Sequence, residues 1–436
     1  MQSLRRLFTK RSTILSLIIL ILAAMLLASF VPQTFLMSKE GIKKWHSDYP
    51  AWSLTAEKMG LTSIYTHPLF ALVLLGASAS LAFSSLDSVR RAVKLSRGTV
   101  EDATEWLRFE TGRPAADIEV YLRKHRYSSR NGSFVRYAPG YWGAPMLHIG
   151  FMVVIIVSLW MALTQRRGLV SLVEGEAFVP GQAWLASEEG LLVKPLILDD
   201  AVRLDGLDFE FWPSYATKRI GSHLTFVSSR GDVTRRTVEV NSVLMHKGVR
   251  VYQMLDFGHA FAVQVVDSSG KSNLTHLLIH RQSAPDKPEY VTYEDFPEKG
   301  RTLKAKYFAE ADRSSLNGKN PELVLRIDEK GKEVGQALLT IGGKADLAGY
   351  HFRLEGVRRW TNLTFVRITG VGGLFCGFAL ICLGCVLHFF VVPRVAVLQP
   401  SPGGTELCWR AERFEDFFKE EFDTLRLVFE GQAKDG

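Results

Sequence analysis

The stretch that decides the fold is APGYWGAPMLHIGFMVVIIVSLWMALTQ, residues 138–165. It contains no Asp, Glu, Lys or Arg, and its one histidine is His148. An apolar helix of about 20 residues crosses the roughly 30 Å hydrocarbon core of a bilayer. The sequence therefore predicts a membrane-spanning helix over residues 146–164 that carries a histidine within it.

Three more stretches of the chain meet the same requirement. Residues 13–31, 68–85 and 368–392 are long, apolar and nearly free of charge, and the second is the least hydrophobic because it includes glycine and serine. A basic tail precedes the first stretch, so a cleavable signal peptide is an alternative there. The apolar core is longer than in most signal peptides, which favours a retained anchor. We therefore expect four transmembrane helices.

The Lys and Arg residues outside these stretches set the orientation. They are concentrated in the N-terminal tail and in the segment 86–145, and such basic segments stay in the cytoplasm. The loop 32–67 and the region 165–366 are then exported, and the tail 393–436 returns to the cytoplasm. The net charge of +8 follows from this topology and does not indicate nucleic-acid binding.

The region 165–366 has the pattern of a large exported β domain. Its segments alternate in polarity or are rich in β-branched and aromatic residues, as in GVRVYQML at 248–255 and AFAVQVVD at 260–267. Turn signals such as Lys247-Gly248 separate these segments. Regular short strands of this kind predict an all-β sandwich or barrel. The Pro- and charge-rich stretch 281–302 predicts a mobile loop.

The cytoplasmic segments have the pattern of small α/β elements. Residues 99–112 and 115–125 predict two helices, with a glycine ending the first, and Asn131-Gly132 predicts a hairpin turn. Residues 413–430 of the tail predict a helix with aromatic and aliphatic side chains on one face. Such a helix lies on the membrane, docks on a partner or packs against the chain's own cytoplasmic segment. The sequence leaves these three interpretations open.

Motifs of known catalytic sites are missing from the sequence. The chain has no HExxH, GxSxG, Walker A loop or dinucleotide-binding fingerprint, so we assign no catalytic residue. Cys382 and Cys385 form a CxxC, but Val386 follows where a haem-attachment motif has histidine. Both cysteines lie in the fourth span, where they form either a redox pair or a small-residue packing face. The exported region has no cysteine and therefore no disulfide.

Three histidines lie in or beside the predicted spans. His148 follows Trp142 by six residues, about 9 Å along a helix, which places it in the cytoplasmic half of the membrane. A histidine there binds haem iron, relays protons or hydrogen-bonds a neighbouring helix. His67 stands at the outer end of the second span. His388 stands just inside the cytoplasmic end of the fourth, so an intrachain bis-histidine site with His148 is one interpretation.

In their order along the chain, these features resemble the ResB-like (CcsB-type) cytochrome c biogenesis proteins of System II. ASFVPQ at 28–33 is similar to the family's TxxPQ-type exit from the first span, and MLHIGF at 146–151 to its entry into the third. VEVNSVLMHKGVRVYQM at 238–254 resembles the family segment N-x-P-L-x-x-x-G-x-x-Y-Q, although Ser242-Val243 stands where proline is expected. The residues that carry this match are Asn241, Leu244, Gly248, Tyr252 and Gln253.

The resemblance implies a subunit of a cytochrome c synthase complex in the bacterial inner (cytoplasmic) membrane, non-catalytic or co-catalytic. Its implied partners are an integral membrane protein of the ResC or CcsA type, apocytochrome c, and a thioredoxin-like reductant of the apocytochrome thiols. The implied cofactor is haem, bound transiently, with an axial ligand shared with the partner. His148 best matches the family's iron ligand, and His67 and His388 are further cofactor-binding candidates. Arg136 and Arg394 are candidates to pair with the propionates.

Two other functions fit the same pattern. The first is a membrane-anchored exported scaffold or binding protein without a cofactor. Unlike the haem-handling subunit, such a protein binds no haem and needs no integral membrane partner. The second is a membrane thiol reductant that uses Cys382 and Cys385, which requires that replacing both cysteines abolishes function.

Overall fold

A computed structural model describes residues 2–33, 39–99, 105–267 and 269–430. These residues form two compact units. The first unit, here called the membrane unit, consists of residues 1–163 and 369–436. The second, here called the β unit, consists of residues 164–368. Each unit has its own core, and the two are described separately.

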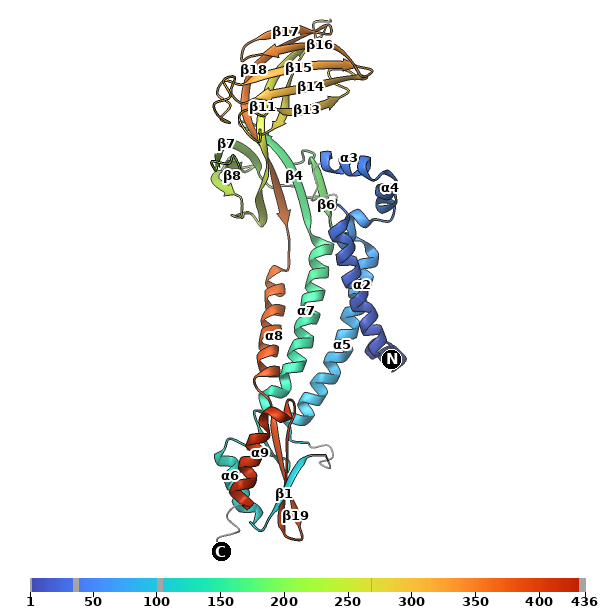
Figure 1. Cartoon of the computed structure of the whole chain (residues 1–436), viewed down its shortest axis with the longest axis vertical. Helices are drawn as coiled ribbons and strands as arrows, with labels where there is room; N and C mark the ends of the chain where they lie inside the picture. The colour runs from blue at the N-terminus through green and yellow to red at the C-terminus, as the bar shows by residue number, and fades with distance from the viewer. Residues whose placement is uncertain (1, 34–38, 100–104, 268, 431–436) are drawn as a thin grey trace. The chain divides into compact units, whose positions relative to one another are not determined.

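The membrane unit contains, among its described residues, the four apolar helices that the sequence predicts (Figure 1). They are α2 (Arg11–Phe30), α5 (Pro68–Ser96), α7 (Gly143–Thr164) and α8 (Val371–Phe389). Helix α5 continues past the predicted end of its span at residue 85. Asp87 in this extension pairs with Arg5 of α1 (Gln2–Thr9), with 2.5 Å between carboxylate and guanidinium.

The small and polar residues of α5 serve helix packing. A Cβ added at Gly76 would lie 3.3 Å from Leu17 Cδ2 of α2, and the Ser80 hydroxyl donates to the Phe8 carbonyl at 2.8 Å. Small residues let helices approach closely in a membrane. This explains why the second span is the least hydrophobic. The segment between α2 and α5 holds α3 (Lys39–Asp48), α4 (Pro50–Lys58) and η1 (Leu61–Thr66).

The segment 86–145 and the C-terminal tail together form one small α/β domain, here called the sheet domain (Figure 1). Its five-stranded sheet has the order β1-β20-β19-β3-β2. The strands are β1 (Leu107–Thr111), β2 (Ser128–Arg130), β3 (Ser133–Arg136), β19 (Arg394–Ser401) and β20 (Gly404–Ala411). Strands from two segments far apart in sequence pair directly, with Arg394 opposite Arg136.

The helix predicted over 99–112 is wrong for its second half, because residues 107–111 form β1. Residues 100–104 lie outside the described residues. Alternating side chains of β1 are buried, Phe109 and Thr111 among them, and β20 offers an edge for pairing. Tertiary pairing outweighs helix propensity here. The second helix is confirmed as α6 (Ala115–Lys124), and Asn131 and Gly132 form the expected hairpin turn with positive φ.

The tail helix is α9 (Glu415–Glu430), and it packs against the chain's own cytoplasmic segment. Phe422, Leu425 and Phe429 are buried in a cluster with Ile118 and Leu122 of α6. Of the three interpretations left open by the sequence, packing within the chain therefore applies to this face of the helix.

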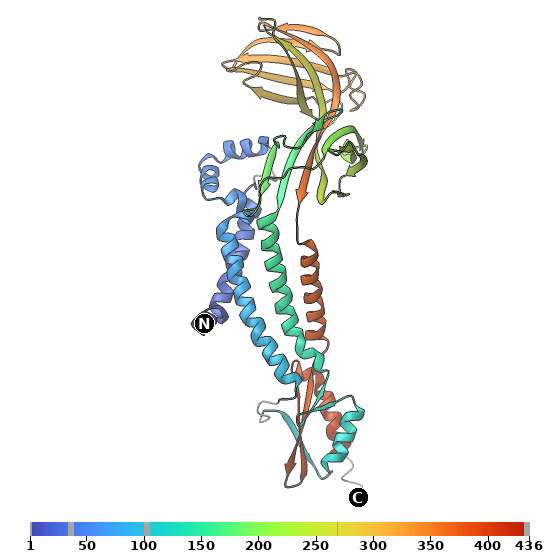
Figure 2. The same ribbon diagram turned by 180° about the vertical axis from the view of Figure 1, so that it is seen from behind.

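The β unit is built on two long antiparallel strands, β11 (Val249–Val266) and β18 (Tyr350–Arg367), which are paired along most of their length (Figure 2). The sequence predicts two strands in the region of β11. The structure has one, with an irregular register between Gln253 and Phe257 that absorbs the interruption.

Three sheets make up the β unit, and none of the ladders among the described strands closes into a barrel. Seven strands form the sheet that contains β11 and β18. They also include β4 (Arg166–Val173), β6 (Ala186–Glu189), β10 (Leu244–His246), β12 (Ser272–His280) and β17 (Lys344–Leu347). The second sheet consists of β13 (Glu289–Glu294), β14 (Arg301–Phe308), β15 (Glu322–Glu329) and β16 (Lys332–Leu339). The third consists of β5 (Ala177–Phe178), β7 (Ala201–Phe211), β8 (Thr217–Val227) and β9 (Val233–Glu239).

The long strands take part in two separate hydrophobic cores. Val263 and Leu354 lie in the core against the second sheet, and Val251 and Phe365 lie in the core against the third. The β unit is thus two sandwich-like lobes on shared strands. The expectation of a mobile loop over 281–302 is wrong for its centre, because residues 289–294 form β13 and turn Val291 toward the first core.

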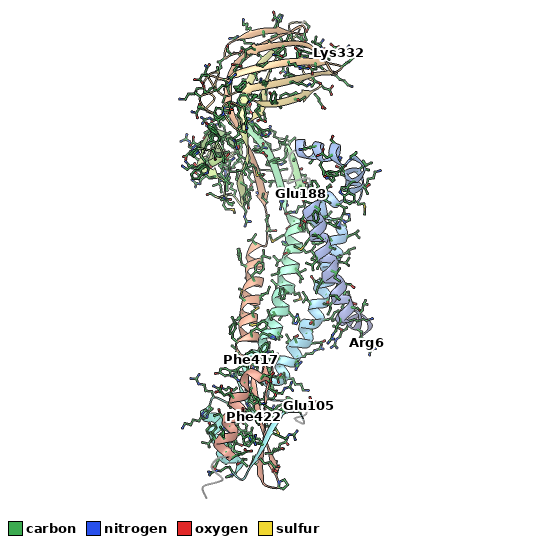
Figure 3. All side chains as sticks on the ribbon, in the orientation of Figure 1. Arg6, Glu105, Glu188, Lys332, Phe417 and Phe422 are labelled. Carbon is green, nitrogen blue, oxygen red and sulfur yellow. The ribbon has the colours of Figure 1, made fainter. Side chains whose placement is uncertain are left out.

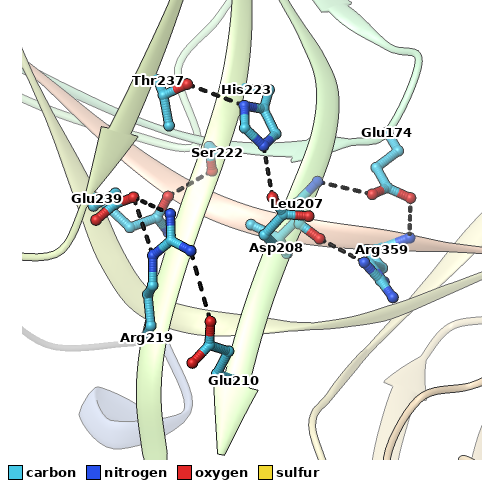
Figure 4. Close-up of polar contacts among 11 residues, drawn as sticks. Glu174, Leu207, Asp208, Glu210, Arg219, Ser222, His223, Thr237, Glu239 and Arg359 are labelled. Atoms are coloured by element: carbon cyan, nitrogen blue, oxygen red, sulfur yellow. Dashed lines mark hydrogen bonds and ion pairs between the residues drawn. The ribbon is translucent and has the colours of Figure 1, made fainter.

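The Glu174 carboxylate joins the third sheet to β18. Glu174, in the turn after β4, accepts hydrogen bonds from the backbone N–H groups of Leu207 at 2.9 Å and Arg359 at 3.1 Å (Figure 4). The Arg359 guanidinium donates to the Leu207 carbonyl at 2.7 Å. Charge-assisted bonds to backbone groups are among the stronger hydrogen bonds. They fix the connection between the two lobes.

Candidate functional site

Helices α7 and α8 pack through glycines, and the candidate site lies at one end of this contact. Gly143 and Gly150 of α7, and Gly377 and Gly384 of α8, are each spaced by seven residues. A Cβ added at Gly150 would lie 2.9 Å from the Ile381 amide nitrogen. A Cβ at Gly384 would lie 2.7 Å from the amide nitrogen of a facing α7 residue. The helix backbones are therefore in direct contact, as small residues allow. We call this contact the glycine seam.

His388 lies at the end of the glycine seam, one turn past Gly384 on the same helix face. A Cβ added at Gly143 would lie 2.5 Å from the His388 amide nitrogen. The His388 Nδ1 atom is buried and has no hydrogen-bond partner among the described residues. Buried polar atoms are almost always paired, so an unpaired one points to a partner from outside the chain or to a functional role.

His148 stands beside the seam on α7 and is half-buried. Leu147, directly before His148, lies against Gly384 of α8, one turn before His388, so the two histidines lie on adjoining parts of the packed helices. The structure thus brings together two of the three histidines singled out in the sequence. The shared leaflet expected for His148 and His388 follows from the antiparallel packing of α7 and α8.

Arg413 completes this end of the site, and the sequence analysis missed it. Its Nη2 donates to the Gly140 carbonyl at 3.2 Å, three residues before the Gly143 that lies against His388. Burial lowers the pKa of Arg413, and the neighbouring Glu412 offsets this only in part. The available signal in the sequence was only its position directly before the tail helix. Only the folding of the tail back onto η2 (Ala138–Trp142) shows the proximity.

Arg136 and Arg394, the cations proposed from sequence for the propionates, are engaged within the sheet domain. Both pair with the Glu421 carboxylate, at 2.9 Å and 3.0 Å respectively. The Tyr127 hydroxyl donates to the same carboxylate at 2.8 Å. Both guanidinium groups are therefore engaged by one carboxylate within the sheet domain. Arg413, which binds the Gly140 carbonyl close to His388, is the better-placed cation.

His67 does not belong to this pair. It caps the N-terminus of α5, where its Nδ1 accepts the Leu69 N–H at 3.2 Å. Ala92, near the other end of α5, packs with residues of η2 in one cluster. The 25 helical residues between 67 and 92 span about 37 Å. His67 is thus separated from His148 and His388 by about the thickness of a membrane.

Backbone contact at Gly143 leaves no room for a porphyrin between the backbones of α7 and α8. The intrachain bis-histidine site stays a prediction, and His148 as a single axial ligand is the simpler arrangement. Among the described residues, no group of three or more His, Cys, Asp or Glu side chains gathers to hold a metal ion. The half-buried imidazole of His148 suits haem iron that is shared with a second protein.

The cysteines of α8 are free thiols in the membrane helix. Cys382 is exposed and Cys385 is half-buried, on either side of Gly384 of the glycine seam. The fourth cysteine, Cys408, is buried in β20. The structure brings none of the described carboxylates or histidines into a hydrogen bond with Cys382 or Cys385.

The segment 238–254 forms a corner of the β unit. Lys247 and Gly248 make the predicted two-residue turn between β10 and β11, both with positive φ. The Gln253 amide is buried, accepting from the Ser222 hydroxyl at 2.5 Å and donating to the Thr361 hydroxyl at 2.7 Å. Asn241 also has positive φ, in the turn after β9. Residues of the segment that resembles the family thus have structural roles.

Asp200 anchors the tip of the same corner. Its carboxylate bonds His246 Nε2 at 2.7 Å and Lys247 Nζ at 2.8 Å. Burial raises the pKa of Asp200, but these hydrogen bonds outweigh burial and the net pKa is lowered. The adjoining cavity, lined by Phe226 and Phe365 among others, has a volume of about 10 Å³, so it admits no more than a water.

Comparisons with known proteins agree on one family. A model described as the ResB-like family matches residues 11–340 of this chain. A cytochrome c biogenesis protein CcsB of Synechococcus sp. (strain JA-2-3B'a(2-13)) is 22% identical over 403 residues, which cover 84% of this chain and 79% of that protein. A CcsB of Synechococcus sp. (strain JA-3-3Ab) is 22% identical over 424 residues, with 90% and 84% covered.

A third relative is matched over a smaller share of its length, and one solved structure has a low structural similarity. The CcsB of Microcystis aeruginosa (strain NIES-843 / IAM M-2473) is 22% identical over 310 residues, which cover 71% of this chain and 63% of that protein. The structure of a cytochrome c heme lyase CcmF aligns with 81% of this chain and 46% of that chain at 11% identity. Its TM-score of 0.26 is too low to indicate a shared fold.

Proposed function

Because this chain belongs to the ResB-like family, we propose that it is a membrane subunit that serves cytochrome c maturation. The names of the three relatives, each a cytochrome c biogenesis protein, support this assignment. The four apolar helices and the large β unit agree with a multi-pass membrane protein. The large unit lies on the exported side in this proposal, since the Lys- and Arg-rich segments belong in the cytoplasm.

The specific task that we propose is to help haem cross the membrane and to present it for attachment to apocytochrome c. The observation that carries this is that His148 and the unpartnered His388 lie on adjoining parts of the packed helices α7 and α8, at the end where Arg413 binds the Gly140 carbonyl. Neutral imidazole is a common axial ligand of haem iron, and arginine pairs with carboxylates such as propionates. Haem is the cargo, and this chain supplies binding and orientation.

Within this proposal each side chain has its own part. His148, half-buried beside the seam, contributes one iron ligand, and an integral membrane partner of the ResC or CcsA type contributes the other. His388 lies behind it, where its buried Nδ1 is available to a ligand or a water. Arg413 holds a propionate at the cytoplasmic boundary. His67 is the candidate ligand at the opposite end of α5.

The β unit has the complementary part of facing apocytochrome c. The sequence of residues 164–368 contains no cysteine, so this unit cannot itself reduce the apocytochrome thiols. A separate thioredoxin-like reductant is therefore part of the proposal. The proposed function does not need the free thiols of α8. It therefore predicts that replacing Cys382 and Cys385 together by serine leaves cytochrome c output unchanged.

The test is to purify this chain in complex with its membrane partner and to record oxidised and dithionite-reduced haem spectra. We expect a low-spin spectrum in the wild type that weakens in His148→Gly and recovers with added imidazole. His67→Gly is the comparison, since it removes the other candidate ligand, at the opposite end of α5, and we expect it to keep the low-spin spectrum. Arg413→Ala lowers haem occupancy without changing the line positions, because the iron ligands stay in place.

Other outcomes would redirect the proposal. If His67→Gly and not His148→Gly loses the low-spin spectrum, the ligand lies at the outer end of α5 and the seam histidines serve packing. If the intact wild-type complex contains no haem, the chain is a scaffold or binding protein without a cofactor. Loss of cytochrome c in the Cys382→Ser, Cys385→Ser double variant would establish the thiol-reductant function.

A further inference from the structure

Four phenylalanine side chains are exposed around the end of α8. Phe389 and Phe390 end the helix and are 52% and 82% exposed. Phe414 and Phe417, at the start of the tail helix, are 46% and 85% exposed. The Phe389 and Phe414 rings stack with centroids 6.3 Å apart, and the Phe414 and Phe417 rings meet at 6.4 Å. The rings of Phe389, Phe414 and Phe417 thus form a continuous series of contacts, and together with the neighbouring Phe390 they are here called the phenylalanine patch.

The phenylalanine patch lies at the level where the apolar helices end. Phe389 is the last residue of α8, and the facing end of α7 begins at Gly143, against His388. Just before it, Tyr137 and Trp142 are also exposed, at 38% and 37%. Aromatic side chains concentrate at the membrane–water boundary because their rings suit the headgroup region. The patch therefore continues the aromatic belt of the membrane helices into the tail.

The packing of α9 does not explain Phe417. The helix buries Phe422, Leu425 and Phe429 against the sheet domain, and residue 417 is about 140° around the helix from residue 422. Figure 3 shows Phe417 at the end of α9 nearer the membrane helices and Phe422 farther along. Phe417 is thus held away from the only core that α9 has among the described residues.

The backbone at the start of α9 is shaped to present these rings. Phe414 has φ +53°, in the left-handed region that bulky residues rarely adopt. Glu415 and Asp416 follow in the first helical turn. Arg413 and Lys419 flank this acidic pair, so the local charge is nearly balanced, and the surface is not a strongly basic site for anionic lipid or for an acidic peptide. Aromatic contact with an uncharged apolar boundary is the chemistry that remains.

We propose that Phe414 and Phe417 enter the lipid headgroup–acyl boundary beside the end of α8 and hold the sheet domain against the bilayer. The occupant of the phenylalanine patch is a zwitterionic lipid surface. The argument rests on continuity with the membrane-spanning helix through the Phe389–Phe414 contact. It is independent of any haem-related function of the chain.

The experiment uses the full chain in phosphatidylcholine nanodiscs, with a spin label at residue 417. Cys376, Cys382 and Cys385 are replaced by alanine, and Cys408 stays because it is buried and unreactive. Phe417→Cys carries the label. Leu427→Cys is the matched control, since Leu427 is 72% exposed on the same helix and lies ten residues, about 15 Å, farther along. Power saturation compares collisions with oxygen and with a water-soluble nickel chelate.

We expect the label at residue 417 to collide more with oxygen than with the nickel chelate, and the label at 427 to show the reverse. The ratio of the two collision rates at 417 should not change when salt is raised, because no charge pairing is involved. Equal nickel access at 417 and 427 would overturn the proposal, as it places both residues in water. Shielding of 417 from both reagents would also overturn it, because a protein partner would then cover the patch.

A second measurement needs no substitution. The wild-type chain is illuminated in nanodiscs that contain a phosphatidylcholine with a diazirine near the headgroup, and the labelled peptides are identified by mass spectrometry. We expect labelling within residues 414–418 and none within 423–430. Labelling that is confined to α2, α5, α7 and α8 would contradict the proposal even if the cysteine variant failed to fold.

Discussion

Gly143 of α7 lies directly against the backbone of His388 in α8. A Cβ at residue 143 would be 2.5 Å from the His388 amide nitrogen and 2.8 Å from its Cβ, closer than real Cβ atoms come to other atoms. The position of the His388 imidazole relative to His148 therefore depends on the absence of a side chain one helix away. The candidate site and the helix packing are in this sense the same contact.

The first prediction follows from this contact. Gly143→Ala should force α7 and α8 apart and lower the thermal stability of the purified chain, with a cost of about 1–3 kcal/mol for an overpacked contact. Fluorescence-detected gel filtration of heated samples measures it. Gly372→Ala in α8 is the control, because no atom lies within 4 Å of a Cβ there. Alanine favours a helix over glycine, so Gly372→Ala should be neutral or stabilising. Equal loss in both variants would contradict the glycine seam.

The second prediction concerns the buried amide of Gln253. Gln253→Leu leaves the hydroxyls of Ser222 and Thr361 without their amide partner inside the β unit, at a cost of about 1–3 kcal/mol. Thermal unfolding of the full chain should shift to lower temperature. Gln264→Leu on the same strand breaks only an exposed bond to Ser272 and should have a small effect. If the two variants behave alike, Gln253 is not a structural centre of the corner.

The third prediction concerns Glu421, which holds the tail helix to the sheet domain. Glu421→Gln removes the charge that Arg136 and Arg394 share, and hydrogen bonds to charged groups contribute roughly 1.5–3 kcal/mol. We expect faster amide hydrogen exchange throughout residues 415–430, seen by mass spectrometry. Glu420→Gln changes the neighbouring exposed carboxylate and should leave exchange unaltered. Protection that persists in Glu421→Gln would mean that apolar packing alone holds α9.

The fourth prediction is a pH dependence that arises from His259. This residue is fully buried in the β unit, with its Nδ1 2.9 Å from the Tyr307 hydroxyl. Burial, together with the charge of Arg359, lowers the pKa of His259 from 6.5 to about 4. Between pH 6.5 and about 4, His259 binds a proton in the unfolded chain but stays neutral in the folded chain. Stability is therefore complete above pH 6.5 and falls as the pH drops toward 4, by on the order of 3 kcal/mol.

Unfolding curves of the wild type and His259→Gln at several pH values measure this effect. The wild type should lose more stability between pH 7 and pH 4.5 than the variant does. His223→Gln is the comparison, because His223 is an exposed histidine bonded to Asp208 on the surface of the third sheet (Figure 4). Parallel curves for the wild type and His259→Gln would contradict a neutral buried histidine.

Local signals in the sequence were sufficient for much of the fold. Four apolar stretches predict four helices because the length needed to cross a bilayer is fixed by its thickness. Asn131-Gly132 and Lys247-Gly248 predict turns because each contains glycine, which adopts positive φ without steric cost, and both turns are present. Helix α6 follows from its apolar periodicity in the same way.

The failures share a physical cause, which is pairing between distant segments. β1 lies in a stretch with helical propensity and becomes a strand only because β20, from the tail, pairs with it. The joining of two expected strands into β11 depends on continuous pairing with β18. The proximity of Arg413 to His388 likewise depends on the tail folding back. The position of His148 and His388 at one seam could be predicted only by matching the glycines of α7 with those of α8.

The two strands that begin and end the β unit are neighbours, with Arg166 of β4 opposite Arg367 of β18. Antiparallel partners of this kind have Cα atoms about 5 Å apart. The β unit is therefore a cassette whose two ends meet at one point of the chain. Closing such a gap with a short turn costs little chain entropy, so the cassette can be excised or exchanged for another without changing the lengths of the helices on either side. A lineage could replace the whole β unit and keep the pair of membrane helices, α7 and α8, that carries it.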